Sequence, residues 1–494
     1  MPSSPEIGAR SALRWLPLVF GAAGALGLGG WLQLAWQQIF HPLELFGHEG
    51  AIVDHIARVL RGEPIYGPPA IDFVPFLYTP AYYWVCAAFA WAGDLAFVVP
   101  RLVSFGATLG SLACLLAMVV RAGGASVWGM VAIGAYALAA SRVEAWYALA
   151  QVDSLFVLCL SIAMLLAQRA ESLRAYFLVG LVFAAAFWCK QSGLVAGLVF
   201  AAAIAPNTGR GAAGVVAGMA IGIAPAVVWF VLATDGWFWF YVFAIPAGFG
   251  EDIAKFGLLL RHDVPVLLPA GVIAIACLVN LWQQGQRQAV WRYGAIGLSL
   301  AGTAIAGRLH VGGHVNTLLP ALWLMALALG LGGGLLWRAA NVTFLPARWT
   351  LPAVAALTAL QLALISGDFD RFRPAPNGKA VAAAMKEKLA LAERPMLLAG
   401  LGYLVGEPSG ADSVALNDVM RIDPERARPV LAELERAMRD RRYRTVVIED
   451  FLRRRYEPRF EAFYRSAGPL AEDYDALRPR AGLDFGPPWL LVPR

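Results

Sequence analysis

Charge is scarce in this chain, and that scarcity excludes an ordinary soluble protein. Charged residues make up only 15% of the 494 residues, whereas hydrophobic residues make up 59%. Apolar runs long enough to cross a bilayer, which takes roughly 20 residues, recur between residues 15 and 366. The short alternating strands of a β-barrel are not found. The composition therefore predicts a polytopic α-helical membrane protein embedded in a lipid bilayer.

Other signals are missing as well. No basic stripe is interleaved with exposed aromatic residues, which argues against a nucleic-acid partner. Gly400-Leu-Gly402 lacks the third glycine of a nucleotide-binding fingerprint. The N-terminal apolar run has no convincing cleavage site, so we expect no cleaved signal peptide. The cysteines lack metal-binding spacing, and we interpret them as small residues of the membrane core. They are Cys86, Cys114, Cys159, Cys189 and Cys277.

The apolar runs predict 11 membrane spans, with residues 78–97 lying beside the membrane without crossing it. The spans are residues 15–38, 98–120, 125–141, 152–167, 174–189, 190–206, 212–233, 263–283, 290–307, 315–337 and 349–366. This count places ten arginines on one side, which the positive-inside rule makes cytoplasmic. They are Arg10, Arg14, Arg121, Arg169, Arg174, Arg210, Arg287, Arg292, Arg338 and Arg348. If residues 78–97 crossed, Arg121 to Arg348 would lie outside, against the rule.

Charged residues are concentrated in the C-terminal part of the chain. Residues 368–494 hold 22 of the 40 lysines and arginines and 20 of the 34 acidic residues. Short apolar runs at 395–400, 443–448 and 489–492 predict buried strands, and 425–442 has helical spacing. We therefore expect two domains, a transmembrane domain at 1–367 and a small soluble α/β domain at 368–494. An odd number of spans places the second domain outside the cytoplasm.

Acidic residues gather in the first outer loop, residues 40–97. Glu44, Glu49, Asp54, Glu63 and Asp72 follow directly after the first apolar span. Acids beside a membrane are costly to keep and tend to be functional. This loop is therefore the first place to expect a site.

Motifs in and after this loop occur in a characteristic order. A Gly-x-Pro-x-Tyr stretch ends at Tyr66, and a Tyr-Thr-Pro-x-Tyr-Tyr segment begins at Tyr78. The next span opens with Val-Pro-Arg-Leu-Val-Ser at 99–104. Over roughly residues 10–340 the chain resembles the GT-C superfamily of membrane glycosyltransferases. It is most similar to the branch with protein O-mannosyltransferases, the lipid A aminoarabinose transferase and rhizobial lipopolysaccharide galacturonosyltransferases.

The resemblance implies a polyprenyl-phosphate sugar donor and transfer outside the cytoplasm. The family's first outer loop supplies a carboxylate, often as Asp-Glu, where this chain has His48-Glu49. We expect Glu49 to be the general base, since burial can raise its pKa toward the working pH. Asp54 and Asp72 would orient the acceptor or hold a cation. A divalent cation stays open as a cofactor, with Glu49, Asp72 and His48 as candidate ligands.

Cations on the same side are candidates for the donor phosphate. They are Lys190, Arg261, Arg308, His310 and His314, beside which Gln191 and the family-like Asn316 lie. The alternative is that the arginines lie near lipid headgroups and that the histidines are ordinary loop residues. Lys190 interrupts a long apolar stretch, so it needs a partner or water. We place it with Gln191 at the outer turn of a tight hairpin.

A second outer turn combines aromatic, amide and charged groups. Arg142, Glu144 and Asp153 flank Trp146-Tyr147, a composition suited to a sugar ring. An ion pair that packs this turn against the first loop is the alternative. The tyrosines of the 78–83 segment are typical of a membrane-interface belt, or of a substrate wall.

These observations predict a glycosyltransferase of a bacterial inner membrane, with its site and C-terminal domain outside the cytoplasm. It would move a sugar from a polyprenyl-phosphate donor to an envelope acceptor, which is a glycolipid, a polysaccharide or a protein. A transporter or flippase for a polyprenyl-linked lipid is the alternative, although ionisable groups gather at one face instead of at mid-membrane depth. A non-enzymatic partner in envelope assembly is the third hypothesis.

Overall fold

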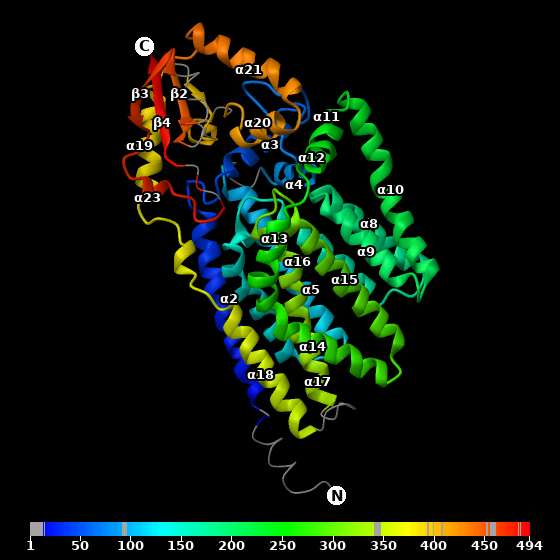
Figure 1. Cartoon of the computed structure of the whole chain (residues 1–494). Helices are drawn as coiled ribbons and strands as arrows, with labels where there is room; N and C mark the ends of the chain where they lie inside the picture. The colour runs from blue at the N-terminus through cyan, green and yellow to red at the C-terminus, as the bar shows by residue number, and fades with distance from the viewer. Residues whose placement is uncertain are drawn as a thin grey trace, which may run out of the picture.

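The chain forms a bundle of long helices with a small α/β domain at one end (Figure 1). The computed structural model describes residues 13, 15–90, 96–339, 347–392, 395–398, 400–406, 409–450, 453–454, 461–482, 484 and 486–494. Seven of the described helical segments are long and apolar enough to cross a membrane. The prediction of a polytopic helical membrane protein with a C-terminal α/β domain is confirmed.

A helix coincides with each of the predicted spans. These helices are α2 (Leu16–Ile39), α5 (Val98–Arg121), α6 (Ser126–Leu138), α7 (Asp153–Ala167), α8 (Leu173–Cys189), α9 (Ser192–Ile204), α10 (Gly209–Ala233), α14 (Val264–Gln283), α15 (Arg287–Leu309), α16 and α17 (Leu319–Leu327 and Gly333–Ala339), and α18 (Ala347–Ile365). A π-helical segment joins α16 to α17. The helices form because a lipid bilayer offers backbone N–H and C=O groups no hydrogen-bond partner. These groups therefore pair with each other along the helix.

Small residues let the helices approach closely. A Cβ atom on Gly134 of α6 would lie 2.0 Å from the Cα atom of Gly24 on α2. Likewise, a Cβ atom on Gly180 of α8 would lie 2.2 Å from the carbonyl oxygen of Val215 on α10. Glycine at such crossings is typical of membrane helices, where close backbone packing drives association.

Arginines mark the end of the bundle opposite the α/β domain. Arg338 donates to the carbonyl of Gly123, and Arg169 donates to that of Arg121 at 3.3 Å. Helix α6 begins just after Gly123 and leads to the turn at Glu144, which contacts the C-terminal domain. The described arginines of the predicted cytoplasmic set thus lie at helix ends away from that domain. Arg10 and Arg14 lie outside the described residues, as does the side chain of Arg348.

The first outer loop folds into two short helices, α3 (Glu49–Leu60) and α4 (Ala81–Ala88). With eight residues, α4 is too short to cross a bilayer, as expected for the segment 78–97. Residues 91–95 of that segment lie outside the described part of the chain. Helix α3 is amphipathic, and its buried face includes Ile52 and Ile56.

The C-terminal domain is a four-stranded sheet with helices on both faces. The strands are β1 (Pro395–Leu397), β2 (Thr445–Glu449), β3 (Tyr464–Pro469) and β4 (Pro488–Pro493), in the spatial order β1-β2-β4-β3. Strands β1 and β2 are parallel, and β4 is antiparallel to both of its neighbours. The three strands expected from apolar runs are present, and β3 is a strand that the sequence did not reveal. The boundary after residue 367 stays a prediction.

Alternating side chains of the sheet pack against different helices. Leu397 and Val447 belong to the same hydrophobic cluster as α19 (Gly378–Ala390). Their neighbours Met396 and Val446 belong to the cluster with α20 (Ser413–Ile422) and α21 (Pro424–Arg439). Because successive strand residues point to opposite faces, the sheet is covered on both sides. Helix α20 also contacts α12 (Ile245–Phe249), which brings this domain against the bundle.

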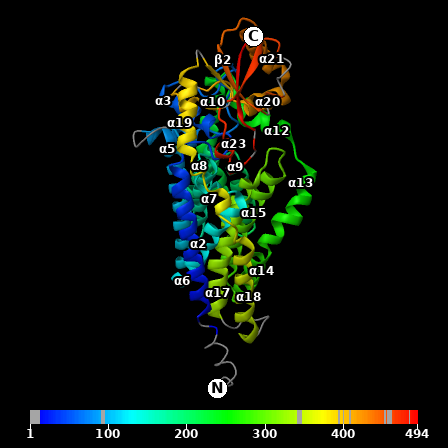
Figure 2. The ribbon, with the colours of Figure 1, turned by 90° about the vertical axis from the view of Figure 1, so that its left-hand side faces the viewer.

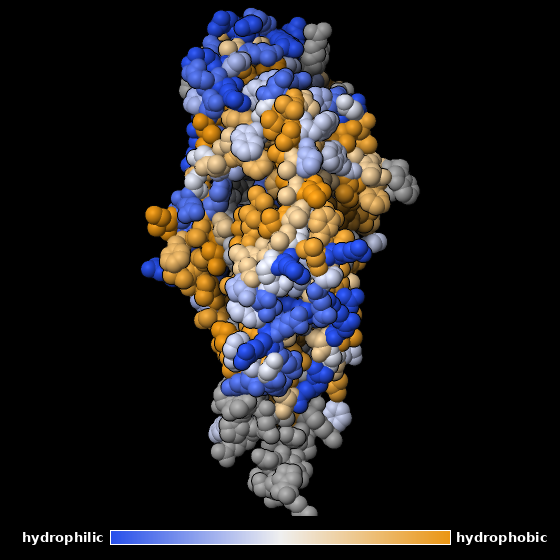
Figure 3. Space-filling view, turned by 90° about the vertical axis from the view of Figure 1, so that its right-hand side faces the viewer, coloured by the Kyte–Doolittle hydropathy of each residue, from blue (hydrophilic) through white to orange (hydrophobic). Residues whose placement is uncertain are grey.

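The surface agrees with a membrane-embedded bundle. Figure 3 shows a zone in which hydrophobic side chains predominate, between hydrophilic side chains of the C-terminal domain and a second hydrophilic zone toward the opposite end. Helix α13 (Ile253–Leu258) stands off at one side in Figure 2. Ile253 on this helix is 86% exposed.

Candidate functional site

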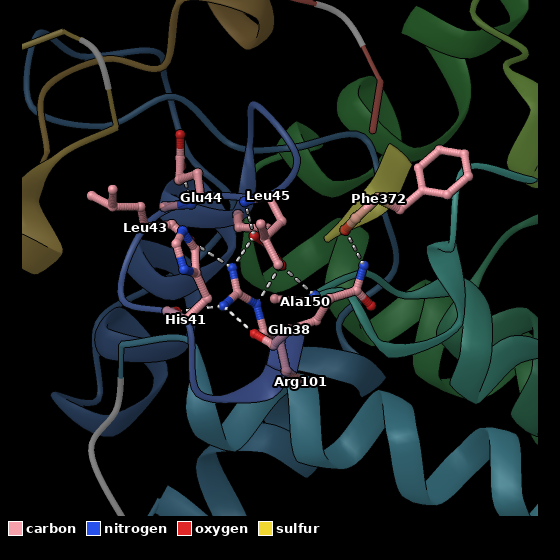
Figure 4. A network of polar contacts seen from close by, with 10 residues as sticks. Gln38, His41, Leu43, Glu44, Leu45, Arg101, Ala150 and Phe372 are labelled. Carbon is pink, nitrogen blue, oxygen red and sulfur yellow. Dashed lines mark hydrogen bonds and ion pairs between the residues drawn. The ribbon is translucent and has the colours of Figure 1, made fainter. Parts of the chain in front are cut away.

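A buried ion pair organises the first outer loop (Figure 4). Arg101, in the first turn of α5, donates through Nε to Oε1 of Glu49 at 2.9 Å and through Nη2 to Oε2. Oε1 of Glu49 also accepts from the backbone N–H of Ala150 at 2.7 Å, and Oε2 from that of Leu45 at 2.8 Å. Arg101 further donates to the carbonyls of Gln38, His41 and Leu43. Both charged residues are fully buried.

This geometry does not fit the expectation that Glu49 is the general base. Its exposed fraction is 0%, and both of its oxygens accept from Arg101 and from a backbone N–H. A base must come within hydrogen-bond reach of the proton that it removes. Glu49 instead joins the loop, α5 and the second outer turn. Its assignment as base stays a prediction that these contacts do not favour.

Asp54 and Asp72 of this loop do not join Glu49. Asp54 accepts from the backbone N–H of Ser409 at 3.2 Å, so it binds the C-terminal domain. Asp72 is exposed, and its negative charge acts on Tyr443 of that domain. Among the described residues, no three histidine, cysteine or acidic side chains are grouped to hold a metal ion. A set made of Glu49, Asp72 and His48 is therefore not assembled, which corrects that expectation.

Three side chains hydrogen-bond to the carboxylate of Asp153. Its Oδ1 lies 2.6 Å from Nζ of Lys190, while Oδ2 accepts from Nε1 of Trp146 at 2.9 Å and Nδ2 of Asn316 at 3.1 Å. Asp153 is 1% exposed, whereas the Lys190 side chain keeps 13% of its surface exposed. The ring centre of Tyr78 lies 5.9 Å from the lysine nitrogen. Lys190, Asp153, Asn316 and Tyr78, each singled out from the sequence, are therefore brought together.

Local structure explains how the chain delivers these side chains. Asp153 opens α7, where a carboxylate is favoured by the helix dipole. Lys190 interrupts the α8–α9 hairpin in an extended conformation, with φ of −156°. Gln191, next to it, donates to the carbonyls of Leu77 and Val242. The hairpin tip thus contacts the loop that carries Tyr78. A turn at residues 190–191 is what the sequence predicted.

Tyr66 holds the backbone of Tyr78 in place. The hydroxyl of Tyr66 donates to the carbonyl of Tyr78 at 2.7 Å. Burial raises the pKa of the Tyr78 hydroxyl; Lys190 lowers it, whereas the negative charges of Asp153 and Asp418 raise it further. Tyr78 is therefore subject to charges from both the Asp153 cluster and the C-terminal domain.

The second outer turn links the same region to the C-terminal domain. Oε2 of Glu144 lies 2.9 Å from Nε2 of His314 and accepts from the backbone N–H of Gly482 at 2.7 Å. Burial raises the pKa of Glu144, but these two hydrogen bonds outweigh it and lower the pKa overall. Glu144 and Ala145 both have positive φ angles, 52° and 55°, a strained conformation for residues other than glycine. Arg142 points elsewhere and donates to the carbonyl of Leu364.

The remaining predicted phosphate ligands form a separate patch near α13. Arg308 pairs with Asp263 at 2.8 Å, and the ring of His310 contacts the carbonyl of Pro246 at 2.8 Å. Lys255 donates to three carbonyls of the loop at 310–313. Arg261 is exposed nearby on a π-helical segment. Among the described residues, none of these four side chains is hydrogen-bonded to Lys190.

Residues of the C-terminal domain complete the region, and no sequence pattern indicated them. Oδ2 of Asp412 lies 3.5 Å from Nδ1 of His48, and Oδ1 accepts from the N–H groups of Val414 and Ala415. Asp412 thus caps the N-terminus of α20 and also contacts His48 of the first loop. Arg101 is the other residue that was missed as a functional group, although an arginine at the start of an apolar span is a detectable signal.

The bundle, the first-loop helices and the C-terminal domain together form a fold that is known from solved structures. Two crystal structures of ArnT from Cupriavidus metallidurans share this fold over nearly their whole length. The apo structure has a TM-score of 0.58 and 14% identity, covering 97% of this chain and 98% of that one. The structure bound to undecaprenyl phosphate has a TM-score of 0.57 and 13% identity, covering 96% and 97%. No protein-family model and no curated protein sequence matches the chain.

Proposed function

We propose that this protein is a glycosyltransferase that uses a polyprenyl-phosphate sugar donor and acts on an envelope acceptor. The observation that carries this proposal is the cluster of Asp153, Lys190, Asn316 and Tyr78 under the C-terminal domain. The shared fold supports it, since a protein of that fold was crystallised with undecaprenyl phosphate. The acceptor would be a glycolipid, a polysaccharide or a protein.

Lys190 is the proposed contact for the donor phosphate. It is a compact cation at a helix-hairpin tip, held at 2.6 Å from Asp153. The lysine has three N–H donors, and Asp153 Oδ1 accepts from one of them. Lys190 can therefore bind a phosphate oxygen while it stays paired with Asp153. A positioned cation of this kind stabilises the charge that grows on a departing phosphate. Asn316 and Trp146 hold Asp153, and through it they orient the lysine.

The arginine-rich end of the bundle supports a proposal for the orientation in the membrane. We propose that this end faces the cytoplasm and that the Lys190 cluster and the C-terminal domain face away from it, because arginines near spans favour the cytoplasmic side. The membrane is a bacterial inner membrane in this proposal. Arg308, Arg261 and His310, which lie near the apolar and exposed α13, would then meet lipid headgroups or the donor's approach.

Glu49 has a positioning role in this proposal. By pairing with Arg101 it sets the loop that places His48 and, through α3, Asp54 against the C-terminal domain. The charge pair satisfies itself within the protein and leaves no free oxygen for the acceptor. The group that takes the acceptor's proton is therefore sought elsewhere.

The test is transfer by the purified protein in liposomes that contain a radiolabelled polyprenyl-phosphate sugar and envelope extracts as acceptors. We expect label to move to an acceptor with the wild-type protein and to stay on the donor with Lys190→Met. The matched control is Lys379→Met, which removes the same charge from an exposed position. Movement of intact donor across the bilayer without transfer would favour a transporter and contradict the proposal.

A further inference from the structure

Aromatic side chains form a continuous row between the first outer loop and the second outer turn. The ring centre of Phe76 lies 6.1 Å from that of His48, and the ring centre of His48 lies 5.5 Å from that of Phe46. The ring centre of Phe46 lies in turn 4.6 Å from that of Trp146. The row therefore crosses from one outer segment to the other.

Polar contacts close this row into a circuit. Trp146 donates to Oδ2 of Asp153, whose Oδ1 lies 2.6 Å from Nζ of Lys190. That nitrogen lies 5.9 Å from the ring centre of Tyr78, and the ring centres of Tyr78 and Phe76 are 6.5 Å apart. The contacts thus return to the residue at which the row begins. We call the members of this closed circuit the side-chain ring.

The side-chain ring is not a solid core. The side chains of His48 and Lys190 keep 14% and 13% of their surface exposed, and Phe46 and Tyr78 are likewise only partly buried. Close packing in a protein interior would leave such large side chains almost no free surface. These four side chains therefore border space that a bound molecule can enter. Aromatic rings beside a few polar groups are the usual lining of a ligand site.

The C-terminal domain lies directly against the side-chain ring. Oδ2 of Asp412 is 3.5 Å from Nδ1 of His48. A Cβ atom on Gly482 would lie 2.2 Å from the ring of Phe46, so the aromatic ring packs against the Gly482 backbone. Both contacts limit the access of water on that side. A ligand in the side-chain ring is therefore partly desolvated, which strengthens its polar contacts.

The charged members of the side-chain ring are already paired. Lys190 pairs with Asp153, and the carboxylate of Asp153 accepts from three side chains in all. His48 faces Asp412, whose Oδ1 accepts from two backbone N–H groups. In the proposed function, the remaining donors of Lys190 bind the phosphate. A carboxylate or an ammonium group on a sugar would thus lose hydration without gaining an unpaired opposite charge from these residues, which is costly.

We propose that the side-chain ring is the subsite for the donor's sugar, and that this sugar is an uncharged pyranose. The inference rests on the proposed function, because it needs Lys190 at the donor phosphate. The CH groups on one face of a pyranose are slightly positive and the face of an aromatic ring is negative, so the two attract each other. Phe46 and Tyr78, whose rings are partly exposed, are the stacking residues.

The test measures the binding of several lipids to the purified protein in detergent. The lipids are polyprenyl phosphate alone and the same lipid carrying mannose, glucose, galacturonic acid or aminoarabinose. Each competes with radiolabelled polyprenyl phosphate. We expect at least one of the two uncharged sugars to make its lipid bind about tenfold more tightly than the bare lipid, through stacking on two rings. The acidic and amino sugars should not improve binding.

Two variants remove the stacking faces. Phe46→Leu keeps an apolar side chain and should weaken binding of the uncharged-sugar lipid by about two- to tenfold, the range for one aromatic contact. Binding of the bare lipid should stay unchanged, and Tyr78→Leu should show the same pattern. The control is Phe105→Leu, which removes a ring that stacks on Trp31 inside the bundle at 5.6 Å. It should change the binding of neither lipid.

The outcomes separate this inference from the proposed function. Equal losses for the bare and the sugar-bearing lipid would give Phe46 and Tyr78 a structural role and overturn the inference alone. Tighter binding of a charged sugar, or no preference for any sugar-bearing lipid over the bare lipid, would overturn it as well. A wild-type protein that binds polyprenyl phosphate in none of these forms would instead overturn the proposed function.

Discussion

Arg101 and Glu49 form an ion pair that is completely buried between the first outer loop and α5. Removing one partner of such a pair leaves an uncompensated charge, which costs about 3–5 kcal/mol. We expect Glu49→Gln to lower the melting temperature of the purified protein by several degrees, as measured by thermal unfolding in detergent.

The double variant Glu49→Gln/Arg101→Gln should recover part of that stability, because it removes both charges. A Glu49→Gln protein with unchanged stability and no transfer would instead favour Glu49 as the base. The two roles therefore give opposite results in the same measurement.

The Asp153–Lys190 pair separates stability from donor binding. Lys190→Met leaves the buried Asp153 unpaired, so it should lower the melting temperature, and Asp153→Asn combined with it should restore much of the loss. Both proteins should lose the stabilisation that added polyprenyl phosphate gives the wild type, because ligand binding stabilises in proportion to occupancy. Stabilisation by the lipid that persists in the double variant would rule out Lys190 as its ligand.

Docking of the C-terminal domain should depend on pH through Asp54. Burial raises the pKa of Asp54 to about 6. A carboxyl whose folded pKa lies above its unfolded value, about 3.9, stabilises the fold most below pH 4, and this contribution is lost as pH rises through 6. Asp54→Asn should therefore raise the melting temperature at pH 8 and change it little at pH 4.5. The reverse order would show that Asp54 does not carry this dependence.

The close contact of Gly50 with Gly400 predicts a specific sensitivity. A Cβ atom on Gly50 would lie 2.0 Å from the carbonyl oxygen of Gly400, so the two backbones could not stay in place. Alanine normally favours a helix over glycine by about 1 kcal/mol, but here the clash should prevail. Gly50→Ala should make the C-terminal domain easier to cleave in limited proteolysis. Gly67→Ala is the control, since a Cβ there meets nothing within 4 Å.

Orientation in the membrane can be tested with two cysteine substitutions at exposed arginines. Arg428 lies on α21 of the C-terminal domain, and Arg287 begins α15 at the arginine-rich end. In intact cells, a membrane-impermeant maleimide should label Arg428→Cys and spare Arg287→Cys. Labelling should reach both after the cells are permeabilised. The opposite pattern would invert the proposed topology.

The helices could be predicted because a single apolar run of bilayer length can satisfy its backbone hydrogen bonds in lipid only as an α-helix. Strand β3 could not, since Tyr464–Pro469 lacks alternating apolar residues. It is an edge strand with a bulge between Ser466 and Gly468, and its position depends on β4. Edge strands of this kind leave little hydrophobic pattern in a sequence.

The members of the site could be predicted better than their partners. Lys190 could be predicted as a site residue because a charge in an apolar stretch needs a partner. Asp153 could be predicted separately because aromatic residues lie near it. Their pairing depends on how α7 packs against α8, which no local pattern reveals.

The position of β4 in the sheet has a consequence for biosynthesis. This strand is made after the rest of the sheet, yet it lies between β2 and β3, so the sheet cannot close until residue 493 has been synthesised. Gly482, which holds the second outer turn through Glu144, belongs to the same late segment. The bundle can therefore insert long before the C-terminal domain has folded over it.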